Sequence, residues 1–314
     1  MRKQIAIVFP GQGSQSVGML AELAAAYPLV PETFAEASAV LGTDLWNLVS
    51  QGPKELLDRT DLTQPAMLTA GVAVWRVWQL EGGTRPDWLA GHSLGEFTAL
   101  VCAGALGFAD AVALVAQRGR FMQEAVPAGA GAMAAILGLA DDQVAAACAE
   151  AAQGQVLAPV NFNSPGQVVI AGEAAAVERG IAAAKARGAK RAVPLPVSVP
   201  SHCALMRPAA ERLAVALAAV DITTPRIPVL HNATVDTAQE PEAIRERLVR
   251  QLHSPVRWVE TVRRLADGGV SLVIEAGPGK VLAGLTKRID ERLEGLAMFD
   301  PKGLSAALEA TQDV

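Results

Sequence analysis

The pattern of apolar and polar residues predicts short buried strands that are separated by helices. Residues 5–9 form a continuous apolar run, which is typical of a strand buried on both faces. Similar apolar runs occur at 88–90, 227–231 and 270–275, and a long apolar helix is predicted over 66–81. Strands that alternate with helices predict an α/β fold with a mainly parallel sheet covered on both faces, as in a hydrolase-like core.

The pattern changes after residues 127–131, where Pro, Gly and Ala follow one another. The next six predicted elements are, in order, a strand at 133–137, a helix at 140–152, strands at 156–162 and 167–171, a helix at 174–187 and a strand at 191–195. This β-α-β-β-α-β order is that of a ferredoxin-like α+β unit. We therefore predict a large α/β catalytic subdomain, residues 1–127 and 197–314, and a small inserted subdomain, residues 128–196.

Two further helices are predicted in the large subdomain from their apolar residues. One follows the strand at 88–90 and extends over 96–106, and the other extends over 281–293. After Asp300 the pattern predicts only a weak helical tail.

Composition and charge narrow the range of partners. Hydrophobic residues make up 51% of the 314 residues but aromatic residues only 4%, so small side chains must fill the interior, which favours tight packing of helices on a sheet. The net charge of −5 argues against a general nucleic-acid-binding protein. The three cysteines contain no C-x-x-C spacing and indicate neither a disulfide framework nor a zinc site.

The first residues superficially resemble a signal peptide, because a basic start precedes the apolar run 5–9. That run is too short for export and ends at Pro10. No run of about 18 apolar residues is present that could span a bilayer. We expect a cytoplasmic protein that does not associate with a membrane.

Ser93 is the strongest candidate nucleophile. It lies in the sequence Gly91-His92-Ser93-Leu94-Gly95, a Gly-x-Ser-x-Gly pattern between a predicted strand and a predicted helix. That context presents a serine hydroxyl on a sharp turn, where glycines on either side leave room for strand and helix to approach. A plain tight turn is the alternative interpretation of the motif alone.

A serine nucleophile needs a base, and the chain has four histidines. His202 is the preferred candidate because Pro200 places it at a strand end. His92 is expected to leave the turn on the other side and to have a structural role. His231 could be a core histidine, and His253 lies in a predicted loop.

Several other polar residues lie in informative places, and each has two interpretations. The loop that contains Gln12 could cradle a phosphate, although it lacks G-x-G-x-x-G and P-loop spacing, or it could lend an amide to a neighbouring site. Arg118 lies among apolar residues of a predicted helix and either extends to solvent or pairs with a buried group. Four side chains could face a cleft or could serve only turns and caps: Gln64, Asn161, Asn163 and Gln167.

Five motifs, taken together, resemble the malonyl-CoA:acyl carrier protein transacylase family. They occur in the family's order over nearly the whole chain, with the ferredoxin-like insert in the expected place. The motifs are Gly11-Gln12-Gly13-Ser14-Gln15, Gly91-His92-Ser93-Leu94-Gly95-Glu96, Gln117-Arg118-Gly119-Arg120-Phe121-Met122, Pro200-Ser201-His202 and Gly277-Pro278-Gly279.

The resemblance implies roles for individual residues. Ser93 would be the nucleophile and His202 its base, with Gln251 orienting His202 through a backbone carbonyl. The amides of Gln12 and Leu94 would form an oxyanion hole. Arg118 would bind the free carboxylate of the malonyl group with its planar guanidinium.

The resemblance also implies the reaction. Malonyl would pass from CoA to the serine and then to the phosphopantetheine thiol of acyl carrier protein, without a metal or other cofactor, in a protein expected to be a monomer. Two alternatives stay open at this point. One is a serine thioesterase or hydrolase, and the other is the same transfer serving malonate decarboxylation or polyketide synthesis.

Overall fold

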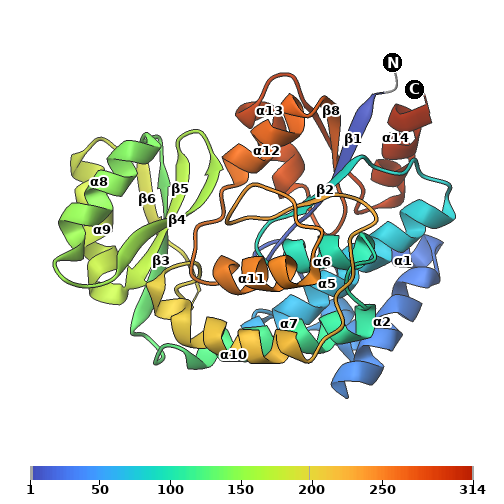
Figure 1. Ribbon diagram of the computed structural model, residues 1–314, viewed down its shortest axis with the longest axis horizontal. Coiled ribbons are helices and arrows are strands. Elements are labelled where there is room, and N and C mark those ends of the chain that lie inside the picture. The colour runs from blue at the N-terminus through green and yellow to red at the C-terminus, as the bar shows by residue number, and fades with distance from the viewer. Residues whose placement is uncertain (1–2, 198, 313–314) are drawn as a thin grey trace.

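Five parallel strands form the centre of the larger part of the molecule (Figure 1). The computed structural model describes residues 3–197 and 199–312. The strand order is β7-β2-β1-β8-β9, and every neighbouring pair is parallel. The strands are β1 (Gln4–Phe9), β2 (Trp88–Gly91), β7 (Val229–Leu230), β8 (Val270–Glu275) and β9 (Glu294–Ala297).

Helices cover both faces of this sheet. Ile5, Ile7 and Phe9 of β1 belong to one apolar core and Ala6 and Val8 to another, as expected when alternate side chains point to opposite faces. The second core is closed by α12 (Trp258–Asp267) and α13 (Val281–Ile289). The first is closed by α1 (Ala21–Ala26), α2 (Leu29–Leu41), α3 (Leu45–Gln51), α4 (Lys54–Leu57), α5 (Thr60–Leu80), α6 (Gly95–Cys102), α7 (Phe108–Glu124), α10 (Arg207–Ala218), α11 (Pro241–Gln251) and α14 (Pro301–Gln312).

A smaller antiparallel sheet lies to one side of this layer (Figure 1). Its strand order is β4-β5-β3-β6, the order of a ferredoxin-like fold. Its elements are β3 (Gly131–Leu137), α8 (Asp141–Ala152), β4 (Leu157–Ser164), β5 (Gln167–Glu173), α9 (Ala174–Ala186) and β6 (Arg191–Pro194). The predicted class, a parallel α/β core with a small antiparallel α+β unit, is confirmed.

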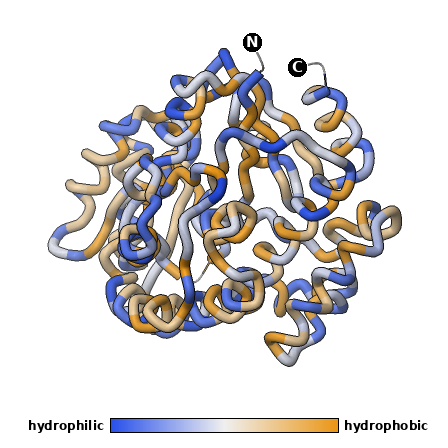
Figure 2. Tube along the Cα trace, turned by 45° about the vertical axis from the view of Figure 1, so that its right-hand side comes forward, coloured by the Kyte–Doolittle hydropathy of each residue, from blue (hydrophilic) through white to orange (hydrophobic). Residues whose placement is uncertain are grey.

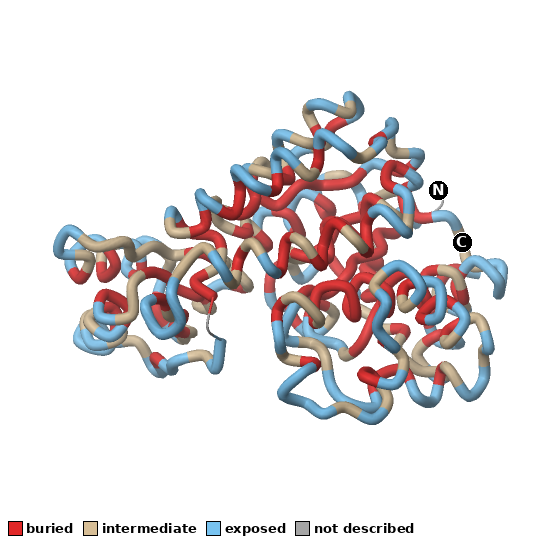
Figure 3. Tube along the Cα trace, turned by 90° about the horizontal axis from the view of Figure 1, so that it is seen from below, coloured by how far each residue is buried: buried red, intermediate tan, exposed pale blue. Residues whose placement is uncertain are grey.

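Most apolar residues of each part form clusters of their own, but Cys203 of the large part packs with Met133, Val160, Val169 and Ala171 of the small part. Hydrophobic and hydrophilic residues alternate along the helices (Figure 2), and buried residues gather inside each part (Figure 3). The backbone of Val256 in the large part pairs with β4, donating to Val160 O at 2.8 Å and accepting from Phe162 N at 3.0 Å. No helix among residues 3–197 and 199–312 is long and apolar enough to cross a membrane.

Several predicted helix boundaries are wrong. The helix predicted over 66–81 begins at Thr60, since Pro65 lies inside it instead of starting it. The helix predicted over 96–106 ends at Cys102.

The C-terminal region departs further from the pattern. The helix predicted over 281–293 ends at Ile289, and Glu294–Ala297 forms an edge strand whose pairing with β8 overrides its local preference. The weak tail after Asp300 is a regular helix, α14. Asp300 Oδ1 accepts from Gly303 N at 2.6 Å, and Pro301 occupies the first helical position.

Glycines allow β1, β2 and α6 to approach one another at the turn between β2 and α6. A Cβ at Gly95 would lie 2.1 Å from the carbonyl oxygen of Phe9, and one at Gly91 would lie 1.9 Å from the carbonyl group of Gly95. Both neighbours are backbone atoms, which cannot move aside as a side chain can. The packing of α6 against the sheet therefore excludes any side chain at these two positions.

We expect Gly95→Ala to lower the free energy of unfolding by roughly 2–4 kcal/mol, because overlap with the β1 backbone would displace α6. Gly284→Ala is the matched control, since Gly284 is exposed within α13 and an added Cβ there would meet no atom within 4 Å. Its expected effect is a gain of roughly 0.5–1 kcal/mol. Urea unfolding of the two variants measures both. Equal stabilities would contradict the close approach at Gly95.

Candidate active site

Ser93 occupies a strained turn that points its hydroxyl away from the sheet. It follows the last residue of β2 by two positions and has a φ of 52°, a left-handed conformation that is uncommon outside glycine. The Asn232 side chain holds the Gly91–Ser93 segment of this turn. Its Oδ1 accepts from Ser93 N and its Nδ2 donates to Gly91 O, each at 2.6 Å.

His202 lies directly against the serine hydroxyl. Its Nε2 is 2.7 Å from Ser93 Oγ, and its Nδ1 is 2.8 Å from the backbone oxygen of Gln251. Because a carbonyl oxygen can only accept, Nδ1 carries the proton of the neutral ring. Nε2 therefore presents its lone pair to the hydroxyl, which is the tautomer a general base requires.

The surroundings of His202 keep its ring neutral. The side chain is buried, and burial lowers the pKa of His202 to about 3, helped by the nearby cation of Arg118 and opposed by the hydrogen bond to Gln251. The ring is therefore unprotonated at neutral pH.

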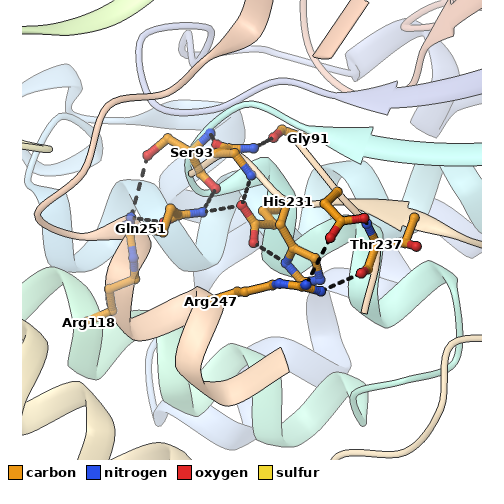
Figure 4. A network of polar contacts seen from close by, with 10 residues as sticks. Gly91, Ser93, Arg118, His231, Thr237, Arg247 and Gln251 are labelled. Atoms are coloured by element: carbon orange, nitrogen blue, oxygen red, sulfur yellow. Dashed lines mark hydrogen bonds and ion pairs between the residues drawn. The ribbon is translucent and has the colours of Figure 1, made fainter. Parts of the chain in front are cut away.

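Arg118 brings a positive charge to the same place (Figure 4). Its side chain extends from α7 and is only 1% exposed, so the interpretation that it reaches solvent is wrong. Nη1 donates to Gln64 Oε1 at 2.8 Å and Nη2 to Gln251 Oε1 at 2.9 Å, and Nη2 also lies 3.4 Å from Ser93 Oγ. The cation thus lies beside the candidate nucleophile.

The guanidinium has no carboxylate bound to it within residues 3–197 and 199–312, and its Nε has no hydrogen-bond partner there. The Phe97 ring lies 5.4 Å from the guanidinium carbon. Burial lowers the pKa of Arg118 to about 10, with Glu96 acting in the opposite direction, so the group is a cation at neutral pH. A buried cation held only by neutral groups is suited to binding an anion.

Two backbone amides lie next to the turn without an acceptor. Gln12 follows β1, and its neighbour Gly11 is so close to the turn that a Cβ there would lie 2.4 Å from His92 O. Leu94 precedes the first residue of α6. Neither Gln12 N nor Leu94 N donates to an acceptor in the described part of the chain, while the Gln12 side chain reaches Thr60. Both amides can therefore receive a developing oxyanion.

The other predicted polar residues separate into those that contact the site and those that do not. Gln64 is buried and holds Arg118, and Asn163 Oδ1 lies 2.8 Å from His92 Nε2, so His92 has the expected structural contact. Gln167 bonds only Ser164 at its own turn, and Asn161 Oδ1 has no partner among the described residues. Those two are not brought into contact with Ser93, His202 or Arg118.

Glu96 and Asn232, to which the sequence assigned no role, complete the network together with His231, which is a buried core histidine as the sequence allowed. Glu96 is fully buried, and its Oε1 lies 2.7 Å from Nδ1 of His231. Its Oε2 accepts from Asn232 N at 2.9 Å and from Gln251 Nε2 at 2.8 Å. Two signals in the sequence were available: Glu96 is an acidic residue in an otherwise apolar helix, and the polar pair His231-Asn232 directly follows a strand. No group of three or more His, Cys, Asp or Glu side chains in the described residues could hold a metal ion.

Comparison with known proteins gives consistent matches over nearly the whole chain. Residues 6–295 match the family model described as "Acyl transferase domain". The malonyl CoA-acyl carrier protein transacylase of Salmonella typhimurium is 63% identical over 305 residues, which cover 97% of this chain and 99% of that protein.

Solved structures are similar to the same extent. An acyl carrier protein S-malonyltransferase from Vibrio cholerae has a TM-score of 0.95 at 60% identity, covering 96% of this chain and 99% of that one. A malonyl-transacylase solved in complex with its type II PKS acyl-carrier protein has a TM-score of 0.97 at 59% identity, covering 98% and 99% of the two chains.

The low pKa of His202 has a consequence for stability at acid pH. A histidine of the unfolded chain binds a proton near pH 6.5, whereas folded His202 does so only near pH 3. Within this window the unfolded state binds more protons, so the free energy of unfolding should decrease as the pH falls.

We expect His202→Asn to make stability less steeply dependent on pH between 6.5 and 4.5. His92, whose pKa burial also lowers, keeps part of the slope in the variant. Urea unfolding of both proteins at four pH values in this range measures the slopes. Equal slopes would contradict a neutral buried His202.

Proposed function

The chain belongs to the acyl transferase domain family, and we propose that it transfers the malonyl group of malonyl-CoA to the phosphopantetheine thiol of acyl carrier protein. One observation carries the proposal. A hydroxyl, a neutral imidazole and a buried cation, from Ser93, His202 and Arg118, meet at one point although they lie far apart in the chain. One chain supplies all of these groups, so the reaction needs no second subunit.

In the first half-reaction, Ser93 Oγ attacks the thioester carbonyl carbon while its proton passes to His202 Nε2. The unbonded amides of Gln12 and Leu94 are placed to donate to the oxygen that becomes negative, and each such donor is worth roughly 3–4 kcal/mol of barrier lowering. The carbon–sulfur bond then breaks, and the CoA thiolate takes the proton from His202. The product is a malonyl-serine ester.

The second half-reaction reverses these steps with a different thiol. The phosphopantetheine thiol gives its proton to His202 Nε2, and its sulfur attacks the ester carbonyl. The carbon–oxygen bond breaks, and Ser93 Oγ takes the proton back. Gln251 O holds the ring throughout, because its bond to Nδ1 stabilises the protonated imidazole in both halves.

The position of Arg118 supports malonyl as the acyl group. Its Nη2 lies 3.4 Å from Ser93 Oγ, so a carboxylate bound there must be close to the reacting carbonyl. Only one methylene separates these groups in malonyl. An acetyl group would leave the buried cation without an anion, which is unfavourable by several kcal/mol.

A serine hydrolase is the competing function, and the environment of His202 argues against it. Hydrolases of this kind orient their histidine with a carboxylate, whereas here a backbone carbonyl has that position. A carboxylate-binding cation beside the nucleophile also serves acyl selection and has no necessary part in hydrolysis. The transferase that was solved with its type II PKS carrier protein uses the same fold, so we extend the proposal to malonyl delivery in general and not to one pathway.

Mass spectrometry of the intact protein tests the reaction. Incubation with malonyl-CoA should add one malonyl group to Ser93, and addition of holo acyl carrier protein should remove it with formation of malonyl-carrier. Ser93→Ala should acquire no malonyl group. Release of free malonate at the same rate with and without carrier protein would instead indicate a hydrolase.

We expect Arg118→Ala to reduce kcat/KM for malonyl-CoA by at least 100-fold and to leave or increase that for acetyl-CoA, because it removes the charge that pairs with the free carboxylate. Arg118→Lys should recover less than a tenth of the malonyl activity, since an ammonium offers no planar fork. Steady-state assays with the two thioesters measure the ratio. An unchanged preference in Arg118→Ala would refute the role of this side chain.

A further inference from the structure

A carboxylate that takes no part in the proposed chemistry, that of Glu96, joins His231, Asn232 and Gln251 in the site's polar network. Glu96 comes three residues after Ser93 and is fully buried. Each of its oxygens has at least one donor: Nδ1 of His231 for Oε1, and Asn232 N with Gln251 Nε2 for Oε2. Burying a carboxylate is unfavourable unless it is fully bonded, so its presence here points to a specific role.

Glu96 is one of three neighbours that determine which way round the Gln251 amide lies. Gln251 Nε2 faces two acceptors, Glu96 Oε2 at 2.8 Å and the backbone oxygen of Ser93 at 2.9 Å. On the other side, Gln251 Oε1 faces Arg118 Nη2, which can only donate. A reversed amide would place NH2 against the guanidinium and an oxygen against two oxygens. Only one orientation is therefore compatible with these neighbours.

The same amide positions the part of Arg118 that faces the serine. The nitrogen bonded to Gln251 Oε1 is Nη2, and Nη2 is also the nitrogen 3.4 Å from Ser93 Oγ. Gln64 holds the other terminal nitrogen, Nη1. A shift of the Gln251 amide would therefore move the donor that a bound malonyl carboxylate meets first.

Gln251 also has two functions that can be separated by mutation. Its backbone oxygen bonds His202 Nδ1, and its side chain bonds Glu96 and Arg118. Arg247, one helical turn earlier in α11, bonds Thr237 and Asp236 and so fixes the backbone of α11 independently of the Gln251 side chain. Loss of the Glu96 contact should leave the base in place.

We propose that Glu96 is a specificity-determining positioning residue. Acting through the side-chain amide of Gln251, it holds the Arg118 guanidinium where the carboxylate of the acyl group binds. The inference rests on the proposed malonyl transfer and adds a residue that selects the acyl group without touching it.

The test compares two substitutions of Glu96. One shortens the side chain and keeps its negative charge, and the other keeps its length and removes the charge. Glu96→Asp keeps the charge but withdraws the carboxylate by one methylene from Gln251 Nε2. Glu96→Gln keeps the reach: its oxygen can still accept from Asn232 N and Gln251 Nε2, while its NH2 meets His231 Nδ1, which becomes an acceptor in the other neutral tautomer. If the contact with Gln251 is what matters, the shorter side chain should be the more harmful.

The readout is the ratio of kcat/KM for malonyl-CoA to that for acetyl-CoA. We expect Glu96→Asp to lower this ratio at least tenfold and Glu96→Gln to keep it within threefold of the wild type or above it. The rate at which phenylmethanesulfonyl fluoride modifies Ser93 should stay within threefold in both variants, because the Ser93–His202 pair is intact. Glu275→Asp is the matched control, since Glu275 is equally buried in β8 but bonds Ala283 of α13, and its ratio should not change.

An unchanged ratio in Glu96→Asp would overturn the inference. It would also be overturned if the ratio fell as far in Glu96→Gln as in Glu96→Asp, because the negative charge of Glu96, and not its contact with Gln251, would then determine the preference. If Glu96→Asp does not fold, Gln251→Met removes the same contact from its other end and keeps the backbone carbonyl. It must also lower the ratio tenfold, and an unchanged ratio would overturn the inference. The wild-type protein shows which of the two proposals fails. If the wild type does not prefer malonyl-CoA over acetyl-CoA, the proposed function is refuted. If it does and the variants keep that preference, only the role of Glu96 is refuted.

Discussion

The site is built around a buried cation that the protein itself does not neutralise by direct contact. Arg118 is surrounded by amide oxygens and an aromatic ring, and the nearest carboxylate in the network, that of Glu96, is separated from it by the Gln251 side chain. A guanidinium in such surroundings depends on acceptors that the protein fixes in place, and a bound anion would complete its shell. The helices α5, α6, α7 and α11 all contribute a residue to this arrangement, so their packing is constrained by one charge.

The end of α11 joins the cation to the base. Gln251 gives its backbone oxygen to His202 and its side chain to Arg118, so the groups that accept a proton and bind a carboxylate share one residue. The loop after β7 extends this link, because Asn232 bonds both Glu96 and the backbone around Ser93. Nucleophile, base and cation are therefore held by a continuous set of hydrogen bonds.

The sequence predicted the site residues that belong to locally recognisable motifs. It gave no role to those whose position depends only on contacts between distant segments. Ser93 lies in a pattern whose geometry follows from its glycines, and a proline marked His202 as the end of a strand. Gln64 was predicted only as one of four side chains that could face a cleft, because its partner Arg118 lies 54 positions away and no local pattern joins the two. β9 was missed for the same reason, since a Glu-Gly-Leu-Ala segment becomes a strand only beside β8. Glu96 and Asn232 belong to this second group: a buried polar residue cannot be recognised as such before its neighbours in space are known.

The electrostatics of the site link the binding of substrate to the strength of the base. The positive charge of Arg118 is one of the causes that lower the pKa of His202, next to burial. A carboxylate bound to Arg118 opposes that charge and so acts against this part of the lowering of the His202 pKa, while burial stays the larger cause. An acyl group without a carboxylate has no such effect. The cation that binds the carboxylate therefore also lies within electrostatic range of the base, so the binding of an anion at Arg118 and the basicity of the imidazole are coupled.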